Sequence, residues 1–162
     1  MRKAYGPVYV NGEKVQVYVD GEKVQVYVDG SCTNNGNAAN AQAGSGVVFG
    51  PGNWRNVAVR VPGEQTNNRG EAFAALQAIL ACDVHKHLEI FSDSEFVIRS
   101  LTHWLATRVS TGWGEAAQGD LFDDIVWLIR RRPAPVSLRK VKAHSGNAHD
   151  DGADALAKQG AA

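Results

Sequence analysis

The chain has 162 residues, of which 44% are hydrophobic and 21% are charged, values that are typical of one globular domain with a substantial core. Its formal net charge is +0, so only local clusters of charge could attract a charged partner. Cys32 and Cys82 are too few for a disulfide framework or a zinc site, which favours a reducing, intracellular location. No apolar run is long enough to span a membrane and no signal-type segment is present, so neither membrane association nor export is expected.

An exact repeat marks the N-terminus. The segment GEKVQVYVD occurs at residues 12–20 and again at residues 21–29. Either a tandem duplication or an engineered insertion would explain the copy. Either Asp20 or Asp29 could therefore end the strand that enters the core. Asp29 is the better candidate, because only Asp29 is followed by the turn sequence Ser-Cys-Thr-Asn-Asn.

The same segment has the local pattern of a small antiparallel sheet. Valine and tyrosine alternate with polar residues, and Asn-Gly and Asp-Gly pairs predict tight turns. Residues 8–28 are therefore predicted to form a three-stranded meander in which Val17 faces Val24 and Val15 faces Val26. An exposed hairpin of this kind has an unpaired edge. We expect a monomer, with a dimer formed by strand pairing as the alternative.

From residue 43 onward the apolar periodicity alternates between that of strands and that of helices. The predicted strands are Gly46–Gly50, Arg55–Val61, Leu88–Phe91 and Val136–Val141, and the predicted helices are Asn67–Cys82, Asp93–Leu105, Leu121–Arg131 and Asp150–Gln159, with a loop at 106–119. Three strands followed by alternating helices and strands predict an α/β architecture with a mixed sheet and helices packed on it.

Four acidic residues are the candidate functional groups. Asp29 and Asp93 follow apolar strands, so their carboxylates would meet at one sheet edge if those strands are parallel neighbours. Glu71 lies in the first turns of a helix, and Asp154 lies on the last helix. Taken singly, Asp93 could cap a helix and Glu71 could complement a helix dipole. Brought together, the four carboxylates would repel one another unless a hard cation lay between them, and such a cluster is typical of metal-dependent phosphodiester cleavage.

The ordered motifs resemble those of the type 1 ribonuclease H family, nearer its eukaryotic branch. The resemblance runs from about Val24 to Ala161 and implies a catalytic domain at 24–162 after an extension at 1–23. It also implies a five-stranded mixed sheet whose first three strands are antiparallel, flanked by helices, to which this chain would add an N-terminal strand or hairpin. The matching segments are Asp29-Gly30-Ser31-Cys32, Thr66–Glu71, Ser92-Asp93-Ser94 and His144-Ser145-Gly146 with Asp154.

The resemblance implies an endoribonuclease that cuts the RNA strand of RNA/DNA hybrids with two Mg²⁺ ions, for which Mn²⁺ could substitute, and that leaves 5′-phosphate and 3′-hydroxyl ends. Asp29 would bridge the ions and Glu71, Asp93 and Asp154 would complete their shells. His144 would assist proton transfer or product release. The residues that would bind the hybrid are Asn34, Asn35, Asn67, Asn68 and Trp104. The alternatives are a catalytically silent nucleic-acid-binding protein and an engineered strand-duplication variant of the same fold.

The chain also departs from the family pattern. Glu64 stands where eukaryotic relatives place an arginine for a DNA phosphate, and Arg108 stands where a second aromatic residue is expected. Asp150 replaces an asparagine, and the segment 108–120 is shorter and less basic than the family's substrate-binding protrusion. Each phosphate contact that is lost lowers affinity and its dependence on salt, so a weaker grip on the DNA strand and low processivity are predicted.

Overall fold

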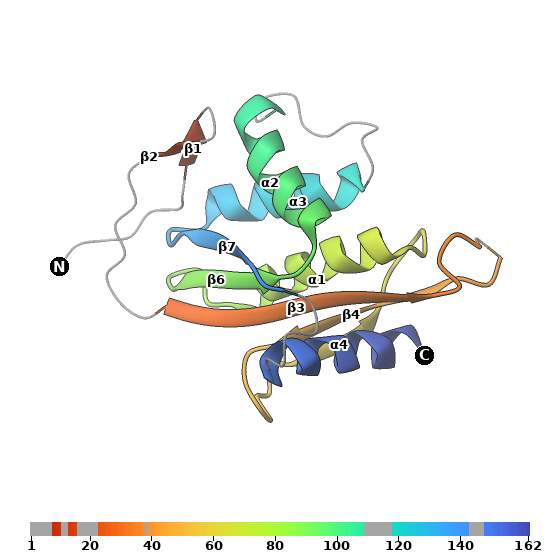
Figure 1. Ribbon diagram of the computed structural model, residues 1–162. Helices are drawn as coiled ribbons and strands as arrows, with labels where there is room; N and C mark the ends of the chain where they lie inside the picture. Colours follow the sequence, from red (N-terminus) through yellow and green to blue (C-terminus); the bar gives the residue numbers. More distant parts are fainter. Residues whose placement is uncertain (1–7, 11–12, 16–22, 38, 109–117, 143–147) are drawn as a thin grey trace.

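A five-stranded mixed sheet with helices on both faces forms the body of the protein (Figure 1). The computed structural model describes residues 8–10, 13–15, 23–37, 39–108, 118–142 and 148–162. The sheet has the strand order β5-β4-β3-β6-β7, and a separate two-stranded sheet consists of β1 and β2. The strands are β1 (Val8–Val10), β2 (Glu13–Val15), β3 (Lys23–Thr33), β4 (Gln42–Val48), β5 (Val57–Arg60), β6 (His87–Ser92) and β7 (Val136–Lys140).

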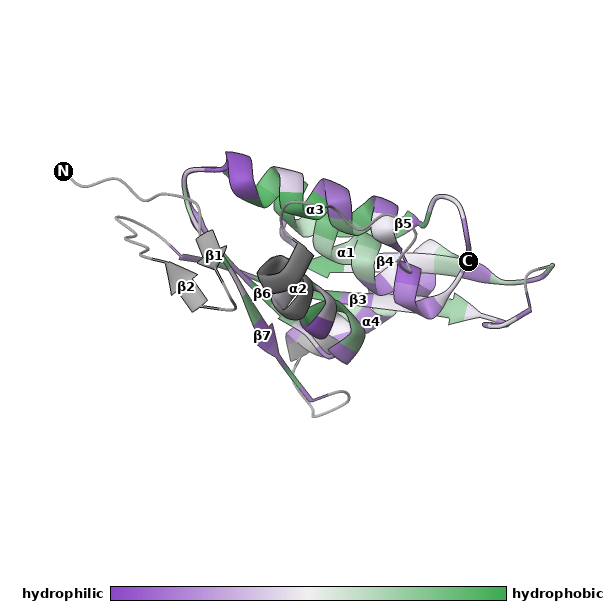
Figure 2. Ribbon diagram, turned by 90° about the horizontal axis from the view of Figure 1, so that it is seen from above, coloured by the Kyte–Doolittle hydropathy of each residue, from purple (hydrophilic) through white to green (hydrophobic). Residues whose placement is uncertain are grey.

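Four helices cover the sheet: α1 (Asn67–Ala81), α2 (Glu95–Arg108), α3 (Gly119–Arg131) and α4 (Ala148–Ala161). Figure 1 shows α4 on one face and α1, α2 and α3 on the other. Alternate apolar residues of β3 and β6, among them Val26 and Ile90, are fully buried with Phe122 of α3. Hydrophobic and hydrophilic residues alternate along α3 (Figure 2), as expected for a helix with one buried side. No helix among the described residues is long and apolar enough to cross a membrane.

The predicted fold class is confirmed. β3, β4 and β5 are antiparallel, whereas β6 and β7 run parallel to β3. The second copy of the repeat lies in β3, the central strand, which pairs with β6 over Lys23–Tyr27 and with β4 over Tyr27–Thr33. Asp29 therefore lies within a strand rather than after one, at the point where β3 has left β6 and is paired with β4.

The first hairpin of the predicted meander is confirmed, but the predicted pairing of its third strand, in which Val15 faces Val26, is wrong. Val15 pairs with Val8 in a hairpin of β1 and β2, and Val26 pairs with Ile90 of β6. Val17 lies outside the described residues. Local alternation favoured pairing between neighbouring segments, but β3 instead buries its valines between β4 and β6, where the core of the domain covers them.

Element boundaries differ from the prediction where small residues replace large apolar ones. β4 begins at Gln42, four residues before the predicted start, because its first half is built from alanine, serine and glycine that give no apolar alternation. α4 extends the predicted last helix at both ends, and α2 reaches Arg108, three residues beyond the predicted end. α3 begins at Gly119, within the predicted loop at 106–119.

Candidate active site

The parallel pairing of β3 and β6 brings two acidic residues to the same edge of the sheet. Asp29 lies two residues after the last β3 residue paired with β6, and Asp93 directly follows β6. Ser94 rather than Asp93 caps α2, because its Oγ accepts a hydrogen bond from Val97 N at 3.2 Å. The interpretation of Asp93 as the cap of α2 is therefore wrong.

Close packing of α1 against β3 brings in the third acidic residue. Thr66 caps α1 by accepting a hydrogen bond from Arg69 N at 3.1 Å, so the helix begins at Asn67 and Glu71 is its fifth residue. Gly30 of β3 lies against this first turn, where a Cβ atom would meet Glu71 N and would lie 2.5 Å from Gly70 C. A glycine at position 30 is therefore what allows the helix start, and Glu71 with it, to approach the strand so closely.

Three carboxylates converge at this edge. Asp29, Glu71 and Asp93 each offer an oxygen atom, and these atoms all lie within 4.8 Å of one another. Asp154 of α4 lines the same pocket, and its carboxylate forms an ion pair with Lys158 Nζ at 3.0 Å. The structure thus brings all four predicted acidic residues to one pocket, with three in a tight group and Asp154 beside it.

The protonation of this group is strongly perturbed. Burial raises the pKa of Asp29 from 3.8 to about 7, and the charges of Asp93 and Asp154 add to the rise. Burial and the neighbouring charge of Asp29 raise the pKa of Glu71 well above its ordinary value. Glu71 Oε2 is buried without a hydrogen-bond partner among the described residues. A buried acceptor beside mutually repelling carboxylates fits a hard divalent cation, which binds oxygen ligands and would relieve the repulsion.

The predicted substrate-binding residues are only partly brought to this site. Asn67 and Asn68 are exposed and line the pocket. Asn35 is linked to them, because its Oδ1 accepts a hydrogen bond from Asn67 N at 3.1 Å. Asn34 instead donates to Asn40 O at 3.3 Å and has a positive φ of 54° within its turn. Trp104 lies on α2 with its side chain outside the described residues, which also exclude His144.

Sequence reasoning did not select Glu95 and Phe96, which also line the pocket. The Glu95 carboxylate accepts a hydrogen bond from Lys140 Nζ at 2.7 Å and pairs with Arg99 at 3.6 Å. The position of Glu95, two residues after Asp93 and at the start of a predicted helix, could have indicated that it lies near the site. Acidic residues are also common at helix starts simply because they complement the helix dipole.

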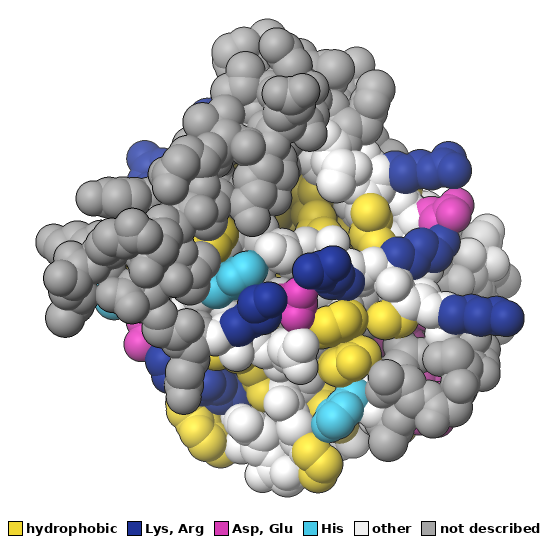
Figure 3. Space-filling view, turned by 60° about the vertical axis from the view of Figure 1, so that its left-hand side comes forward, with side chains coloured by type: hydrophobic (Ala, Val, Ile, Leu, Met, Phe, Trp, Pro, Cys, Tyr) yellow, Lys and Arg dark blue, Asp and Glu magenta, His cyan; other side chains and the backbone are white. Residues whose placement is uncertain are grey.

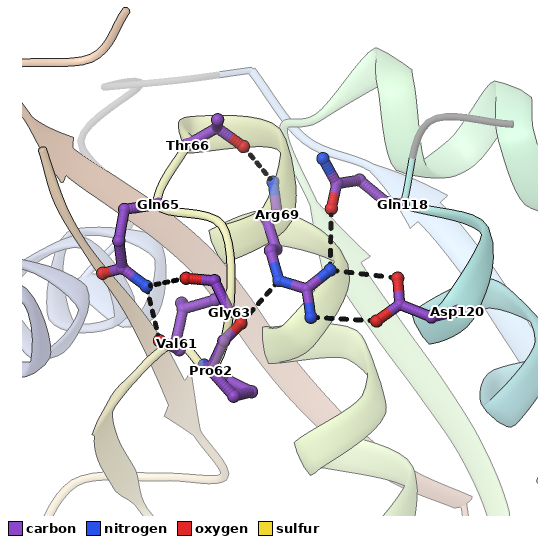
Figure 4. A network of polar contacts seen from close by, with 8 residues as sticks. All are labelled: Val61, Pro62, Gly63, Gln65, Thr66, Arg69, Gln118 and Asp120. Carbon is purple, nitrogen blue, oxygen red and sulfur yellow. Dashed lines mark hydrogen bonds and ion pairs between the residues drawn. The ribbon is translucent and has the colours of Figure 1, made fainter. Parts of the chain in front are cut away.

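A buried arginine fixes the start of α1 from the other side (Figure 4). The side chain of Arg69 is only 11% exposed and forms a two-pronged ion pair with Asp120 of α3, with N–O distances of 3.0 and 2.9 Å. Its Nε donates to Pro62 O at 2.6 Å, and Nη1 also donates to Gln118 Oε1 at 3.1 Å. Gly63 has a φ of +78° and its missing Cβ leaves room for the guanidinium.

The hydroxyl of Ser45 on β4 completes this attachment by donating to Gly70 O at 2.6 Å. The first turn of α1 is thus held by α3 through Arg69, by β4 through Ser45 and by the 34–37 turn through Asn35. Because a planar guanidinium with several partners has little freedom, Arg69 fixes the orientation of the turn that carries Asn67, Asn68 and Glu71.

Comparisons with known proteins agree with this geometry. The RNase H family model matches residues 20–162. Ribonuclease H1 of Homo sapiens is 37% identical over 135 residues, which are 80% of this chain and 47% of that protein, and Ribonuclease H1 of Mus musculus is 36% identical with the same coverage. The chain thus spans about half the length of these mammalian relatives. Ribonuclease H of Parvibaculum lavamentivorans is 36% identical over 127 residues, which are 70% of this chain and 83% of that protein.

Among solved structures, the crystal structure of LC9-RNase H1, a type 1 RNase H with the type 2 active-site motif, matches with a TM-score of 0.68 and 25% sequence identity. The match covers 89% of this chain and 74% of that chain.

Proposed function

Because this chain belongs to the ribonuclease H family, we propose that it is an endoribonuclease that hydrolyses the RNA strand of RNA/DNA hybrids and leaves 5′-phosphate and 3′-hydroxyl ends. The observation that carries the proposal is the group of Asp29, Glu71 and Asp93, whose ligand atoms lie within 4.8 Å of one another. Glu71 Oε2 is buried there and has no hydrogen-bond partner in the part of the chain that the structure describes. A catalytically silent binder is not favoured, because such a protein has no need to keep repelling carboxylates together.

Two Mg²⁺ ions, or Mn²⁺ in their place, are the proposed cofactors. Asp29 is proposed to hold both ions, and Glu71, Asp93 and Asp154, which line the same pocket, would complete their coordination. When bound, the ions would activate the attacking water and stabilise the leaving 3′ oxygen. Lys158 neutralises part of the Asp154 charge until then. His144 is proposed to move a proton or aid product release.

Selection of ribose is proposed to depend on the amide groups at the pocket rim. A 2′-hydroxyl both donates and accepts hydrogen bonds, and so does the side-chain amide of Asn67 or Asn68. Asn35 would act with them through its bond to Asn67 N, and Asn34 through the turn that holds Asn35. Trp104 is proposed to pack against a sugar of the DNA strand. We further propose that 24–162 is the catalytic domain, that residues 1–23 are an extension, and that the protein acts as an intracellular monomer.

Cleavage of a labelled RNA/DNA hybrid tests the proposed function. With Mg²⁺ we expect cutting of the RNA strand alone, with no cutting in EDTA and none by Asp93→Asn. Asp124→Asn is the matched control, since Asp124 is an exposed acid on α3 away from the pocket. The proposal would be wrong if the folded wild-type protein did not cut the hybrid, or if Asp93→Asn cut it as fast as Asp124→Asn.

The first copy of the repeat should be dispensable for this activity. The second copy already supplies β3, including the valines that enter the core. Scrambling residues 12–19 is therefore expected to leave the cleavage rate within about twofold of wild type, as for a surface change. Cleavage and thermal denaturation of the two proteins make the comparison. A sharp fall in cleavage would mean that the first copy occupies the sheet in solution and that Asp20 takes the place of Asp29.

A further inference from the structure

Exposed cations gather along β7 and the strand ends beside it. Figure 3 shows lysine and arginine side chains in a band across this face, with few acidic side chains among them. The exposed fractions of four side chains are 78% for Arg99, 59% for Arg139, 48% for Lys140 and 47% for Lys23. Lys142, two residues beyond the end of β7, is also exposed. We call these five residues the β7 basic band.

Two carboxylates organise the band without neutralising it. Glu89 is 3% exposed and pairs with Arg139 at 2.8 Å and with Lys23 at 3.8 Å, while Glu95 pairs with Lys140 and Arg99. Four of the five cations therefore share two acidic partners. Arg139 uses its Nε on Glu89, and its Nη donors have no hydrogen-bond partner among the residues that the structure describes, so they could bind an oxyanion. The ion pairs orient the band and leave an excess of positive charge at the surface.

The band begins at the active site. Glu95, which positions Lys140 and Arg99, also lines the carboxylate pocket. From there the band passes around the edge strand β7, where the consecutive residues Lys140 and Arg139 lie on opposite faces of the sheet, and it continues from Arg139 past Glu89 to Lys23 at the start of β3. At roughly 3.3 Å per strand residue, this path is about 20 Å long. A duplex rises about 3.4 Å per phosphate on each strand, so a path of this length spans about six base pairs.

We infer that the β7 basic band is a second contact surface for the phosphate backbone of the RNA/DNA hybrid, which holds the duplex outside the carboxylate pocket. This inference rests on the proposed function. The net charge of the whole chain is +0, so attraction to phosphates must come from a local surplus such as this one. Compared with the family pattern, this chain has less positive charge at Glu64 and in segment 108–120. The β7 basic band supplies positive charge at a different place beside the pocket.

The test removes two cations of the band that do not hold the buried Glu89. In the double variant Arg99→Gln/Lys142→Gln, binding of fluorescent hybrids is measured by anisotropy in EDTA, over NaCl concentrations from about 50 to 300 mM. The long hybrid has about 20 base pairs, which at about 3.4 Å per base pair is long enough to occupy the pocket and the whole band together. Arg130→Gln/Arg131→Gln removes the same charge from exposed positions on α3 and is the matched control.

For the long hybrid we expect the band variant to bind several-fold more weakly and its salt slope to fall by up to about two units, since each phosphate contact contributes about 0.9. Cleavage of the long hybrid at saturating concentration should match wild type, because the two substitutions leave the carboxylate group unchanged. The control should match wild type throughout. An unchanged salt slope for the long hybrid, or an equal loss in the control, would overturn the inference.

Failure of the proposed function gives a different result. Wild type could bind the long hybrid with a steeper salt slope than the band variant and yet not cut it in Mg²⁺. In that case the band binds the hybrid as inferred, and the proposed nuclease function is wrong. If wild type cuts hybrids and the band variant keeps the full salt slope, the nuclease proposal stands and the band is overturned. A wild-type protein that does not bind the long hybrid at all would also overturn the band.

Discussion

Asp29→Asn is expected to abolish cleavage and, at the same time, to stabilise the metal-free protein at pH 8. Loss of several kcal/mol of metal-assisted stabilisation of the transition state lowers the rate by about 10³-fold or more. The stability gain arises because ionised Asp29 is buried beside Glu71 and Asp93, which raises its pKa to about 7. Asparagine keeps the shape of the side chain without the charge.

The sign of the pH dependence follows from the direction of this shift. The pKa of Asp29 is higher in the folded protein, at about 7, than its ordinary value of 3.8. The folded state therefore binds the proton more tightly, and this contribution to stability is fully present below about pH 4 and is lost as the pH rises through about 7. In EDTA, the melting temperature of Asp29→Asn should exceed that of wild type by an amount that grows between pH 4 and pH 8.

Melting curves at several pH values in EDTA and in Mg²⁺ measure this difference. At pH 8 without metal, we expect the free energy of unfolding of Asp29→Asn to exceed that of wild type by about 1–3 kcal/mol. Adding Mg²⁺ should raise the melting temperature of the variant less than that of wild type. Asp124→Asn, at an exposed position on α3, should show neither effect. A variant that is less stable than wild type at pH 8 in EDTA would contradict the idea that the carboxylates repel one another.

The convergence of the acidic residues was predictable from the sequence because it follows from strand order. Asp29 and Asp93 each come at the end of an apolar run, so their carboxylates were expected to meet if those runs are parallel neighbours, as the pairing of β3 with β6 shows them to be. The placement of Glu71 was predictable in outline from the Thr66 cap and the helix that follows. Both inferences require only the order and extent of strands and helices along the chain, which the pattern of apolar residues predicts well.

The remaining features depend on contacts that no periodicity records. The choice of Ser94 over Asp93 as the α2 cap, and the pairing of Arg69 with Asp120 across 51 residues, are settled by side chains that meet only in the folded protein. The pairing of Val15 was predicted wrongly for a related reason, since identical copies of a strand sequence offer identical local pairing and only the core distinguishes them. Long-range packing therefore determines what local pattern leaves undecided.

The small residues of β4 are the clearest case, because they determine where α4 and hence Asp154 lie. A Cβ atom on Gly46 would meet Ala153 O and would lie 2.5 Å from Ala157 N, both main-chain atoms of α4 that cannot rotate away. Gly44 has the same relation to the end of α4, where its Cβ would lie 2.6 Å from Gly160 C. The absence of side chains at Gly44 and Gly46 thus allows the helix to lie directly on the strand.

Gly46→Ala is therefore expected to push α4 away from the sheet. Overpacking of this kind costs about 1–3 kcal/mol, which should lower the melting temperature by several degrees. Since Asp154 moves with the helix, cleavage well below the melting temperature should fall by about tenfold or more, a larger loss than the small unfolded fraction explains. Urea denaturation and cleavage at one low temperature, with Mg²⁺ titrated, measure both effects.

Gly152→Ala is the matched control on the same helix. Its Cβ would meet only Val48 Cγ2 at 3.6 Å, an ordinary contact, and replacing a helical glycine by alanine should raise stability by about 0.5–1 kcal/mol. Cleavage by Gly152→Ala should match wild type, because α4 keeps its distance from β4. Wild-type cleavage by Gly46→Ala would contradict this prediction. It would mean either that the position of Asp154 does not depend on the close approach of α4 to β4, or that Asp154 does not contribute to the reaction.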